Sequence, residues 1–509
     1  MNTDYLIIGS GLSALVFGAL MAKSGKQVQI LEAHTHCGGF GHTFNMAKKY
    51  NFNAQLHYVW NCGEGETVNQ VLKFLNLDDE VTFTRYDPDA FDHMRMPNYS
   101  LDIPSDIKEL EKRLEKLFPS ATKKIHRFFY QMTLTSEGLR KPPNLLNPVA
   151  LSRYLHALFY VSIYYNSTLQ DVFNQCKLPL QAQTLLASQW PDFLLPPEKL
   201  SFFAWVMLFT GYQRGAYYPN KHFEHIVNSL VSVIENNGGS VLVDHEVLDI
   251  KVKDKNVTVV HAIDLKQKLS KIFFGKNVIC NIDPQQAVSM IGSVYFSKSI
   301  HQKINYDYSP SNFVAYCVVK NFDLTDFGFG KCNTFHSGHD DLNDAFRVMY
   351  ENNDYSNPSF AITTPTLLTD EVRDCPEGHQ ILQFLTVANF NYFKELKLLG
   401  KKVYNKRKKE ILENMLDVME EQYIPNLRQH IVYKITGTPT TNERYCWCPE
   451  GNSYGSNLTP ANIGLNRLNH QTSLDNLYFC NASSGFPGFA GTFWTGANLY
   501  QKLSGEQIL

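Results

Sequence analysis

The first residues able to do chemistry form a glycine-rich turn near the N-terminus. Residues 9–14 read GSGLSA, and an acidic side chain, Glu32, follows 21 residues after Gly11. Gly9 permits a tight turn, Gly11 lets the backbone approach a pyrophosphate, and the small Ala14 lets a helix pack closely on a sheet. The pattern predicts dinucleotide binding, with Glu32 accepting hydrogen bonds from a ribose hydroxyl.

The elements around this turn are the ones that the motif requires. Residues 5–8 form a short apolar run, residues 15–22 have the composition of a helix, and residues 28–31 form a second strand that ends at Glu32. The N-terminus of this helix supplies free N–H groups and the positive end of its dipole, both of which favour phosphates. The sequence therefore predicts a Rossmann-type strand-helix-strand unit, and a glycine turn in an ordinary βα unit is the weaker interpretation.

A second pair of glycines follows the acid. The segment after Glu32 reads AHTHCGGF, which places Gly38 and Gly39 shortly beyond the second strand. Flavoproteins commonly carry such a pair, because glycine allows another close approach of backbone to the pyrophosphate. The spacing favours FAD over NAD as the cofactor.

Composition and charge exclude several other classes of protein. The 509 residues carry 47 Lys+Arg against 49 Asp+Glu, which leaves a net charge of -2 and predicts no binding of nucleic acid. Ten scattered cysteines fit a reducing compartment, and Cys446 and Cys448 lack a second matching pair, so no metal site is expected. The opening Met1 to Asp4 has no basic signal-peptide region, which predicts a cytoplasmic protein.

The rest of the chain alternates between helical and strand-like blocks. Residues 67–214 carry long amphipathic helices, such as 106–117, and a proline-rich connection at 141–148. Strand-like runs return at 240–243, 257–261 and 278–280, and a second variable block spans 294–471. That block contains strands at 313–319 and 381–387 and a basic helix at 401–419, whose following acids indicate a solvated face. The last block, 474–501, is a second strand, glycine-rich loop and helix.

Several motifs together resemble one family, the FAD-dependent phytoene desaturases, carotenoid isomerases and retinol saturases, and its saturase and isomerase branch most closely. The resemblance covers nearly the whole chain. Its most specific pieces are GSGLSA with LEAHTHCGGFGHTF, FNAQLHYVW (52–60), GAYYP (215–219), VICNIDPQQAV (278–288), TPTTNERYCWCPEGNSYG (438–455) and LYFCNASSGFPGFAGTFWTGA (477–497).

The resemblance implies a fold of the α/β class: a glutathione-reductase-like, Rossmann-type FAD-binding domain, discontinuous in sequence, with an inserted α+β substrate-binding domain. We expect the FAD-binding domain to comprise residues 1–66, 215–293 and 472–509, and the substrate-binding domain residues 67–214 and 294–471. The expected cofactor-binding residues are Gly9, Gly11, Leu12, Ser13, Ala14, Glu32, Ala33, Gly38, Gly39, His42, Thr43, Val247, Asn281, Asn481, Ser483, Gly488, Phe489 and Ala490.

The chain departs from the family's pattern at three places. It has Gln55 and Asn220-Lys221 where relatives usually carry glycines, and Asn481, Ala482 and Ser483 where they carry a glycine followed closely by an acid or amide. These late positions normally lie near the flavin's phosphates and ribityl chain. The following PGFAG segment is retained, so FAD remains the expected cofactor.

The family's chemistry implies a flavin that adds or removes a hydride at a carbon-carbon double bond of an apolar polyene: a carotenoid, a retinoid or an unsaturated fatty acyl chain. Saturation, desaturation and cis-trans isomerisation all remain open. Both reduction and isomerisation need an acid near the flavin, for which His57 and Tyr58 are the first candidates. His57 has the alternative of a core histidine bonded to backbone, and Tyr217 and Tyr218 are weaker candidates that fit packing beneath the sheet.

Aromatic residues are the expected lining of an apolar tunnel. Phe486, Phe489, Phe493 and Trp494 follow the late glycines and are positioned to flank the flavin or the substrate entrance, although helix-to-sheet packing explains Phe493 and Trp494 almost as well. Residues 151–165 (LSRYLHALFYVSIYY) are apolar around much of the helix. This helix either dips into a membrane interface, as relatives that draw lipids from membranes imply, or is buried in the substrate domain.

Two other classes remain as alternatives. Amine-oxidase-like flavoenzymes oxidise a C–N bond and usually carry an arginine directly after the early glycine pair, where this chain has Phe40. Rab GDP-dissociation inhibitors share the architecture and bind prenylated partners without redox chemistry. The intact glycine turns and Glu32 favour a cofactor-binding enzyme over that second class, and the sequence leaves the oligomeric state open.

Overall fold

The computed structural model describes residues 3–140, 147–368 and 374–509. The predicted proline-rich connection at 141–148 lies mostly outside these ranges.

A five-stranded parallel sheet carries the glycine turn. Its strands, in the order β19-β13-β1-β2-β9, come from widely separated stretches of the chain. They are β1 (Thr3–Ile8), β2 (Val28–Leu31), β9 (Ser240–Leu242), β13 (Gly275–Cys280) and β19 (Leu477–Phe479). Because the carboxyl ends of parallel strands meet at one edge, the loops after β1, β2, β13 and β19 gather at that edge.

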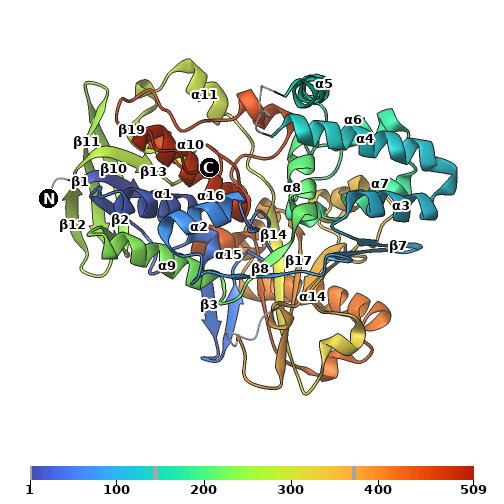
Figure 1. The fold of residues 1–509 in the computed structure, drawn as a ribbon. Helices are drawn as coiled ribbons and strands as arrows, with labels where there is room; N and C mark the ends of the chain where they lie inside the picture. The colour runs from blue at the N-terminus through green and yellow to red at the C-terminus, as the bar shows by residue number, and fades with distance from the viewer. Residues whose placement is uncertain (1–2, 141–146, 369–373) are drawn as a thin grey trace.

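The two faces of this sheet are covered differently, as Figure 1 shows. Tyr5 and Ile7 belong to the core formed with helices on one face, whereas Leu6 and Ile8 belong to a second core on the other face. The helices are α1 (Leu12–Lys23), α2 (Thr67–Leu75), α9 (Phe223–Asn236) and α16 (Gly488–Ser504). The second face is covered by an antiparallel sheet of β10 (His245–Lys253), β11 (Asn256–Asp264) and β12 (Leu269–Phe273), with α10 (Pro284–Ile291).

A seven-stranded sheet forms the other half of the molecule, in the order β18-β14-β17-β16-β15-β6-β7. Only the β15–β6 pair is parallel among the pairings of this sheet. The strands are β6 (Asp92–Met96), β7 (Tyr99–Ile103), β14 (Ser311–Lys320), β15 (Asn333–His336), β16 (Phe360–Thr363), β17 (His379–Ala388) and β18 (Ile431–Gly437). β14 and β17 are buried along almost their whole length, which makes them the centre of this half.

Helices cover this second half and connect it to the first. In the view of Figure 1, the helices from residues 107–214 lie above β7 and β17. They are α3 (Ile107–Leu117), α4 (Thr122–Gly138), α5 (Pro148–Tyr164), α6 (Leu169–Cys176), α7 (Leu180–Ala187) and α8 (Phe202–Arg214). The remaining α-helices are α11 (Lys298–Ile304), α12 (Leu342–Phe346), α13 (Phe390–Leu398), α14 (Lys401–Gln422) and α15 (Pro439–Cys446). Two short ladders pair β3 (Thr43–Met46) with β4 (Tyr50–Asn53) and β5 (Phe83–Arg85) with β8 (Tyr217–Pro219).

The architecture confirms the predicted α/β class with a Rossmann-type unit. The strand expected at 28–31 has these bounds in the structure, and the helix expected at 401–419 is α14, three residues longer. Residues 67–214 differ from the expected helical pattern, because they also supply β5, β6 and β7. The proposed domain boundaries stay a prediction.

Candidate active site

The two glycine segments lie side by side at the carboxyl edge of the parallel sheet. Gly9 has a φ of +92°, and Gly38 and Gly39 have φ of +107° and +54°, conformations that favour glycine. The Gly38 N–H donates to the Ser10 carbonyl over 2.9 Å, and Gly11 forms a bridge with Gly38. The second pair is thus fixed against the first turn, at the start of α1.

Glu32 organises both segments from the end of β2. One carboxylate oxygen accepts hydrogen bonds from the backbone N–H and the hydroxyl of Ser10, at 2.8 and 2.5 Å. The other accepts from the His34 N–H at 2.8 Å. Both carboxylate oxygens therefore accept charge-assisted hydrogen bonds. These bonds fix Ser10 and His34, which flank the position where a ribose would bind.

Asn281 closes the same turn from the end of β13. Its Oδ1 accepts from the Gly11 N–H at 2.8 Å, and its Nδ2 donates to Ser13 Oγ at 3.0 Å and to the Cys480 carbonyl at 2.5 Å. A Cβ on Gly11 would lie 2.7 Å from Asn281 Oδ1. The first helical turn, at Leu12 and Ser13, keeps the N–H groups that a helix start leaves without intrahelical acceptors.

The late loop is shaped by its own side chains. Asn481 Oδ1 accepts from the N–H groups of Ser483 and Ser484, and its amide donates to the Ile282 carbonyl at 3.0 Å. Arg467, which is buried, donates to the carbonyls of Ala482 and Gly485. The departure from the family's pattern at Asn481 therefore supplies a side chain that fixes the loop.

A cavity of about 1490 Å³ connects these elements. Of the expected cofactor-binding residues, Ala14 and Thr43 lie off its wall: Ala14 is packed in the core, and Thr43 Oγ1 is 2.9 Å from His222 Nδ1. The others line it: Gly9, Gly11, Leu12, Ser13, Glu32, Ala33, Gly38, Gly39, His42, Val247, Asn281, Asn481, Ser483, Gly488, Phe489 and Ala490. The cavity exceeds the roughly 300–1,000 Å³ of ordinary ligand pockets, so it has room for more than one ligand.

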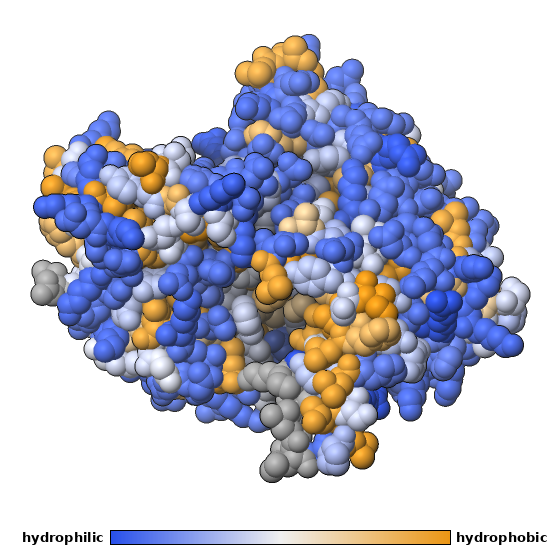
Figure 2. All heavy atoms as spheres, turned by 90° about the horizontal axis from the view of Figure 1, so that it is seen from above, coloured by the Kyte–Doolittle hydropathy of each residue, from blue (hydrophilic) through white to orange (hydrophobic). Residues whose placement is uncertain are grey.

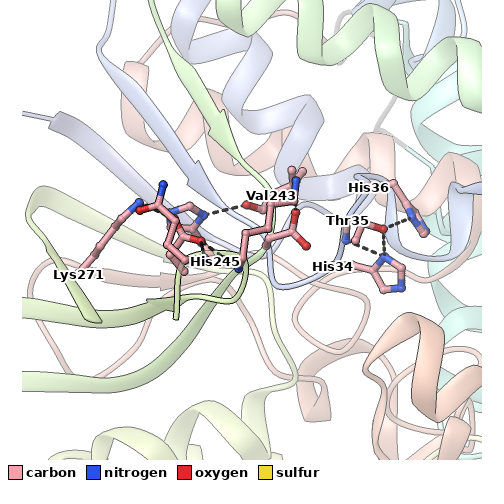
Figure 3. A network of polar contacts seen from close by, with 10 residues as sticks. His34, Thr35, His36, Val243, His245 and Lys271 are labelled. Atoms are coloured by element: carbon pink, nitrogen blue, oxygen red, sulfur yellow. Dashed lines mark hydrogen bonds and ion pairs between the residues drawn. The ribbon is translucent and has the colours of Figure 1, made fainter. Parts of the chain in front are cut away.

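A cluster of histidines borders the cavity beside Glu32 (Figure 3). Thr35 Oγ1 lies 3.2 Å from Nδ1 of both His34 and His36, and the rings of these two histidines are 3.9 Å apart. Burial lowers the pKa of His36 to about 4, so its ring is neutral. Within the described ranges, no group of three His, Cys, Asp or Glu side chains has an arrangement that could hold a metal ion.

The strand that carries Val247 is fixed to this cluster. The His245 N–H donates to the Glu32 carbonyl at 2.8 Å, and His245 Nδ1 donates to the Val243 carbonyl at 2.8 Å. Lys271 donates to His245 Nε2 at 3.1 Å (Figure 3). These bonds place the start of β10, with Val247, on the cavity wall.

His57 and Tyr58 both line the cavity. Neither ring nitrogen of His57 has a hydrogen-bond partner, and both are out of contact with solvent. Burial lowers the pKa of His57 to about 4; the Gln383 side chain, which lies near the ring without a hydrogen bond of good geometry, opposes this shift. The alternative of a core histidine bonded to backbone is not what the structure shows, and a neutral imidazole is a poor proton donor at neutral pH.

Tyr58 leads to a buried pair of carboxyl groups that sequence reasoning missed. Its hydroxyl donates to Asp192 Oδ2 at 2.8 Å and lies 3.2 Å from Asp92 Oδ2. Asp92 also accepts from Gln189 Nε2 at 2.5 Å and Asn333 Nδ2 at 3.2 Å. Asp192 borders the cavity. The amino-acid sequence gives no local signal for this cluster. Asp92 on β6, Asp192 before α8 and Asn333 on β15 are brought together only by the fold.

Other predicted aromatic residues divide between lining and packing. Phe486, Phe489 and Trp494 line the cavity, whereas Phe493 is fully buried in the core. Tyr218 is also fully buried, and its hydroxyl accepts from Asn53 Nδ2 at 2.8 Å. Tyr217 and Tyr218 lie off the cavity wall, in the short β8 strand.

Helix α5 presents apolar side chains to solvent, so the buried alternative for residues 151–165 is wrong. Only Ala157 and Tyr164 of this helix are buried. Figure 2 looks onto this side of the molecule and shows hydrophobic residues gathered there. The exposed members on α5 are Val149, Leu155, Leu158, Phe159 and Ile163. None of the described helices has both the length and the apolar character needed to cross a membrane.

Comparisons with known proteins agree with this geometry. Residues 7–75 match the family model of an NAD(P)-binding Rossmann-like domain. The chain is 26% identical to the all-trans-retinol 13,14-reductase of Danio rerio over 97% of this chain and 85% of that protein. It is 23% identical to prolycopene isomerase 2 of an Oncidium hybrid cultivar, over 95% of this chain and 80% of that protein.

Solved structures share the fold at low identity. An oxidoreductase from Methanosarcina mazei has a TM-score of 0.68 and 14% identity over 98% of this chain and 100% of that chain. A putrescine oxidase bound to putrescine has a TM-score of 0.66 and 12% identity over 99% and 100%. A Rab GDI from Plasmodium falciparum has a TM-score of 0.51 and 11% identity over 99% of each chain. These structures show the fold and leave the reaction to the site.

The full-length similarity in sequence and the Rossmann-type glycine turn agree with the resemblance seen in the motifs. The chain is therefore similar over almost its whole length to all-trans-retinol 13,14-reductases and prolycopene isomerases, which supports an enzyme that uses a flavin or another nucleotide cofactor.

Proposed function

We propose that the protein is an FAD-dependent oxidoreductase or isomerase that acts on carbon-carbon double bonds of a long apolar polyene or isoprenoid. The observation that carries the proposal is one continuous cavity that begins at the glycine turn and extends between apolar side chains from several parts of the chain. These side chains include Leu56, Val59, Trp60, Phe193, Ala204, Met207, Leu208, Leu458 and Ile463.

The glycine-turn end of the cavity fits FAD. The helix start at Leu12 offers unpaired N–H groups to a pyrophosphate, and the second glycine pair and the late loop approach the same region. Glu32 stands where a ribose hydroxyl would donate to it. We therefore propose the expected cofactor-binding residues on the cavity wall as the FAD site, with Ala14 acting through helix packing alone.

The apolar end of the cavity fits a hydrocarbon chain. Bound FAD supplies hydride transfer, which side chains cannot perform at an unactivated carbon. The chain's own residues exclude water and orient the substrate, since Phe193, Met207 and Leu208 offer no hydrogen bonds. His57 lies on the cavity wall, in the lining segment 55–61. Its ring is neutral and has no hydrogen-bond partner.

Two measurements test this function. Purified protein should be yellow, with a flavin spectrum that dithionite bleaches. Mass spectrometry of apolar extracts from cells with and without the protein should then reveal a polyene whose mass rises by a pair of hydrogens for a saturase, falls for a desaturase, or stays constant with a changed retention time for an isomerase. A colourless protein that takes up no added FAD would overturn the proposal.

The likeness to putrescine oxidase favours one second candidate, an amine-oxidase-like flavoenzyme. Phe40 stands where that group usually carries an arginine. Such an enzyme would be yellow but would release hydrogen peroxide with an amine and leave polyenes unchanged. A non-catalytic lipid-binding protein of the Rab GDP-dissociation-inhibitor type would bind an isoprenoid and show no flavin spectrum.

We also propose that α5 makes peripheral contact with a membrane, from which a polyene enters the cavity. The exposed side chains of Leu155 and Phe159, each 58% exposed, support this proposal. α5 packs tightly on α4, because a Cβ on Gly138 would lie 2.7 Å from a side-chain carbon of Val161. Leu139 and Arg140, which follow α4, line the cavity. We therefore propose that the cavity opens near α5.

A further inference from the structure

Two carboxyl groups share the hydroxyl of Tyr58 in the interior. Asp92, on β6, is fully buried, whereas Asp192, in the turn Trp190–Asp192 before α8, is partly open to the cavity. Neither forms an ion pair with a described basic residue. Two like charges held on one hydroxyl in a water-poor interior cannot both persist, so the pair holds one proton at neutral pH.

The hydrogen bonds decide which carboxyl is charged. Asp92 accepts from the amides of Gln189 and Asn333 and lies within reach of the Tyr58 hydroxyl, which stabilises an anion. Among the described residues, the Asp192 carboxyl has one hydrogen-bond partner, Tyr58. The proton therefore belongs on Asp192: its Oδ2 accepts from the Tyr58 hydroxyl, and its Oδ1, which has no hydrogen-bond partner among the described residues, is free to carry the proton. Burial and the nearby Asp92 raise the pKa of Asp192 well above its usual range.

Among the described residues, the groups that face Asp192 carry no positive charge. Tyr58 is stacked between Tyr212, with ring centroids 4.0 Å apart at 7°, and Tyr86, at 5.7 Å. Tyr454 is the fourth phenol near Asp192, and it lies on the cavity wall. Burial raises the pKa of all four phenols, so each stays protonated. No cation therefore drives Asp192 to ionise.

Polar atoms without hydrogen-bond partners lie near the carboxyl pair. Gln189 is fully buried, and its Oε1 has no hydrogen-bond partner although its Nε2 is used by Asp92. His57, the residue before Tyr58, leaves both ring nitrogens unpartnered on the cavity wall. The wall at His57 and the buried layer that contains Gln189 thus carry polar atoms that no described residue satisfies.

We propose that Asp192 is the proton donor to the substrate double bond, and that Tyr58 and Asp92 are positioning residues that keep it protonated. The role rests on the proposed function. In a reduction, the Asp192 O–H bond breaks and its proton forms a C–H bond with one carbon, while the other carbon receives a hydride from a reduced flavin. A reduced flavin held at the proposed site would supply the hydride and its two electrons and would itself be oxidised. The π bond is lost, and Asp192 is left as a carboxylate that accepts from Tyr58 and regains a proton from water after product release.

Infrared spectroscopy of the flavin-loaded protein at pH 8 tests the protonation directly. We expect the carbonyl band of a protonated carboxylic acid in the wild type, its loss in Asp192→Asn, and its retention in Asp374→Asn. Asp374 is a matched control, because burial raises its pKa to about 7 and it lies away from the cavity, 3.2 Å from His222. A wild type without the band, or a band that survives Asp192→Asn, overturns the proposal. An ionised Asp192 would instead suit a cationic amine.

Single-turnover kinetics separate this role from the proposed function. With the flavin reduced beforehand and a polyene bound, Asp192→Asn should slow product formation by about 10²- to 10⁴-fold at unchanged flavin content and polyene affinity. Wild-type rates in this variant overturn the role while the function stands. If the wild type converts no polyene but the infrared band depends on Asp192, the proposed function is refuted, while the protonated state of Asp192 is confirmed.

Discussion

The N–H of Gly11 donates to Asn281 Oδ1 over 2.8 Å, although 270 residues separate the two. The glycine turn after β1 is therefore closed by a side chain from the end of β13, the neighbouring strand. Gly11 has no strained backbone angle; the space around it is what requires a glycine.

Replacing Gly11 with Val should abolish FAD binding. The new side chain would force Asn281 out of the turn, since the first added carbon already lies 2.7 Å from its oxygen, and would occupy the path of the pyrophosphate. Absorbance of the purified variant measures flavin content. Gly330→Val is the control, because a Cβ there meets nothing within 4 Å. Normal flavin content in Gly11→Val would contradict the assignment of this turn.

His57 should make the protein less stable in acid. Its pKa is about 4 in the folded state and near 6.5 when unfolded, so between these values the unfolded chain binds a proton that the folded chain does not. Stability is then lost as pH falls through this window, by at most about 3 kcal/mol. Urea unfolding at pH 7 and pH 4 should show a smaller loss in His57→Gln. His126→Gln, at a side chain 71% exposed, should keep the wild-type loss.

Asp92 should have the opposite pH dependence. Burial raises its pKa to about 7, above the roughly 3.9 of an unfolded aspartate, so in this range the folded protein holds the extra proton. Its stabilising effect is present at low pH and is lost as pH rises from about 4 to about 7, by at most about 4 kcal/mol. Asp92→Asn should flatten the unfolding free energy across this range. Asp102→Asn, at a 45% exposed carboxylate, should leave the dependence unchanged.

Acidic substitutions on α5 should weaken membrane binding. Leu155→Asp with Phe159→Asp places charges on the exposed apolar face and removes burial in the interface, with an expected loss of at least tenfold in binding to phosphatidylcholine vesicles. Flotation measures the bound fraction. Leu398→Asp on α13, at a side chain 81% exposed, is the control. Equal flotation of all three proteins, or none by the wild type, would contradict contact through α5.

Much of the first half could be predicted because its signals are local. The apolar run before Gly9, the spacing to Glu32 and the glycine pair at 38 and 39 are contained in the first 39 residues. Each is tied to a backbone requirement: Gly9, Gly38 and Gly39 all have positive φ in the structure. The loop after β2 accordingly lies against the loop after β1, as a dinucleotide site requires.

The carboxyl pair could not be predicted, because nothing local marks it. Asp92 begins a strand that reads DHMRM, with too few apolar residues for a recognisable buried pattern, and Asp192 follows 100 residues later in a short turn. Their proximity depends on the tertiary fold and on Tyr58, which was singled out only through the family's motif. Asn481 lines the cavity, and its cofactor-binding role stays a prediction; the sequence did not reveal that its side chain is also hydrogen-bonded within the turn.

The order of strands in the parallel sheet bears on how the protein is made. β1 lies between β2 and β13, and the outer strand β19 and helix α16 come from the last stretch of the chain. During synthesis at the ribosome, β1 must wait for more than half of the polypeptide with one edge unpaired, a state prone to aggregation. The proposed cofactor residues extend from Gly9 to Ala490, so the complete site forms only after α16 has been synthesised, and we expect a nascent protein to depend on chaperones until this helix docks.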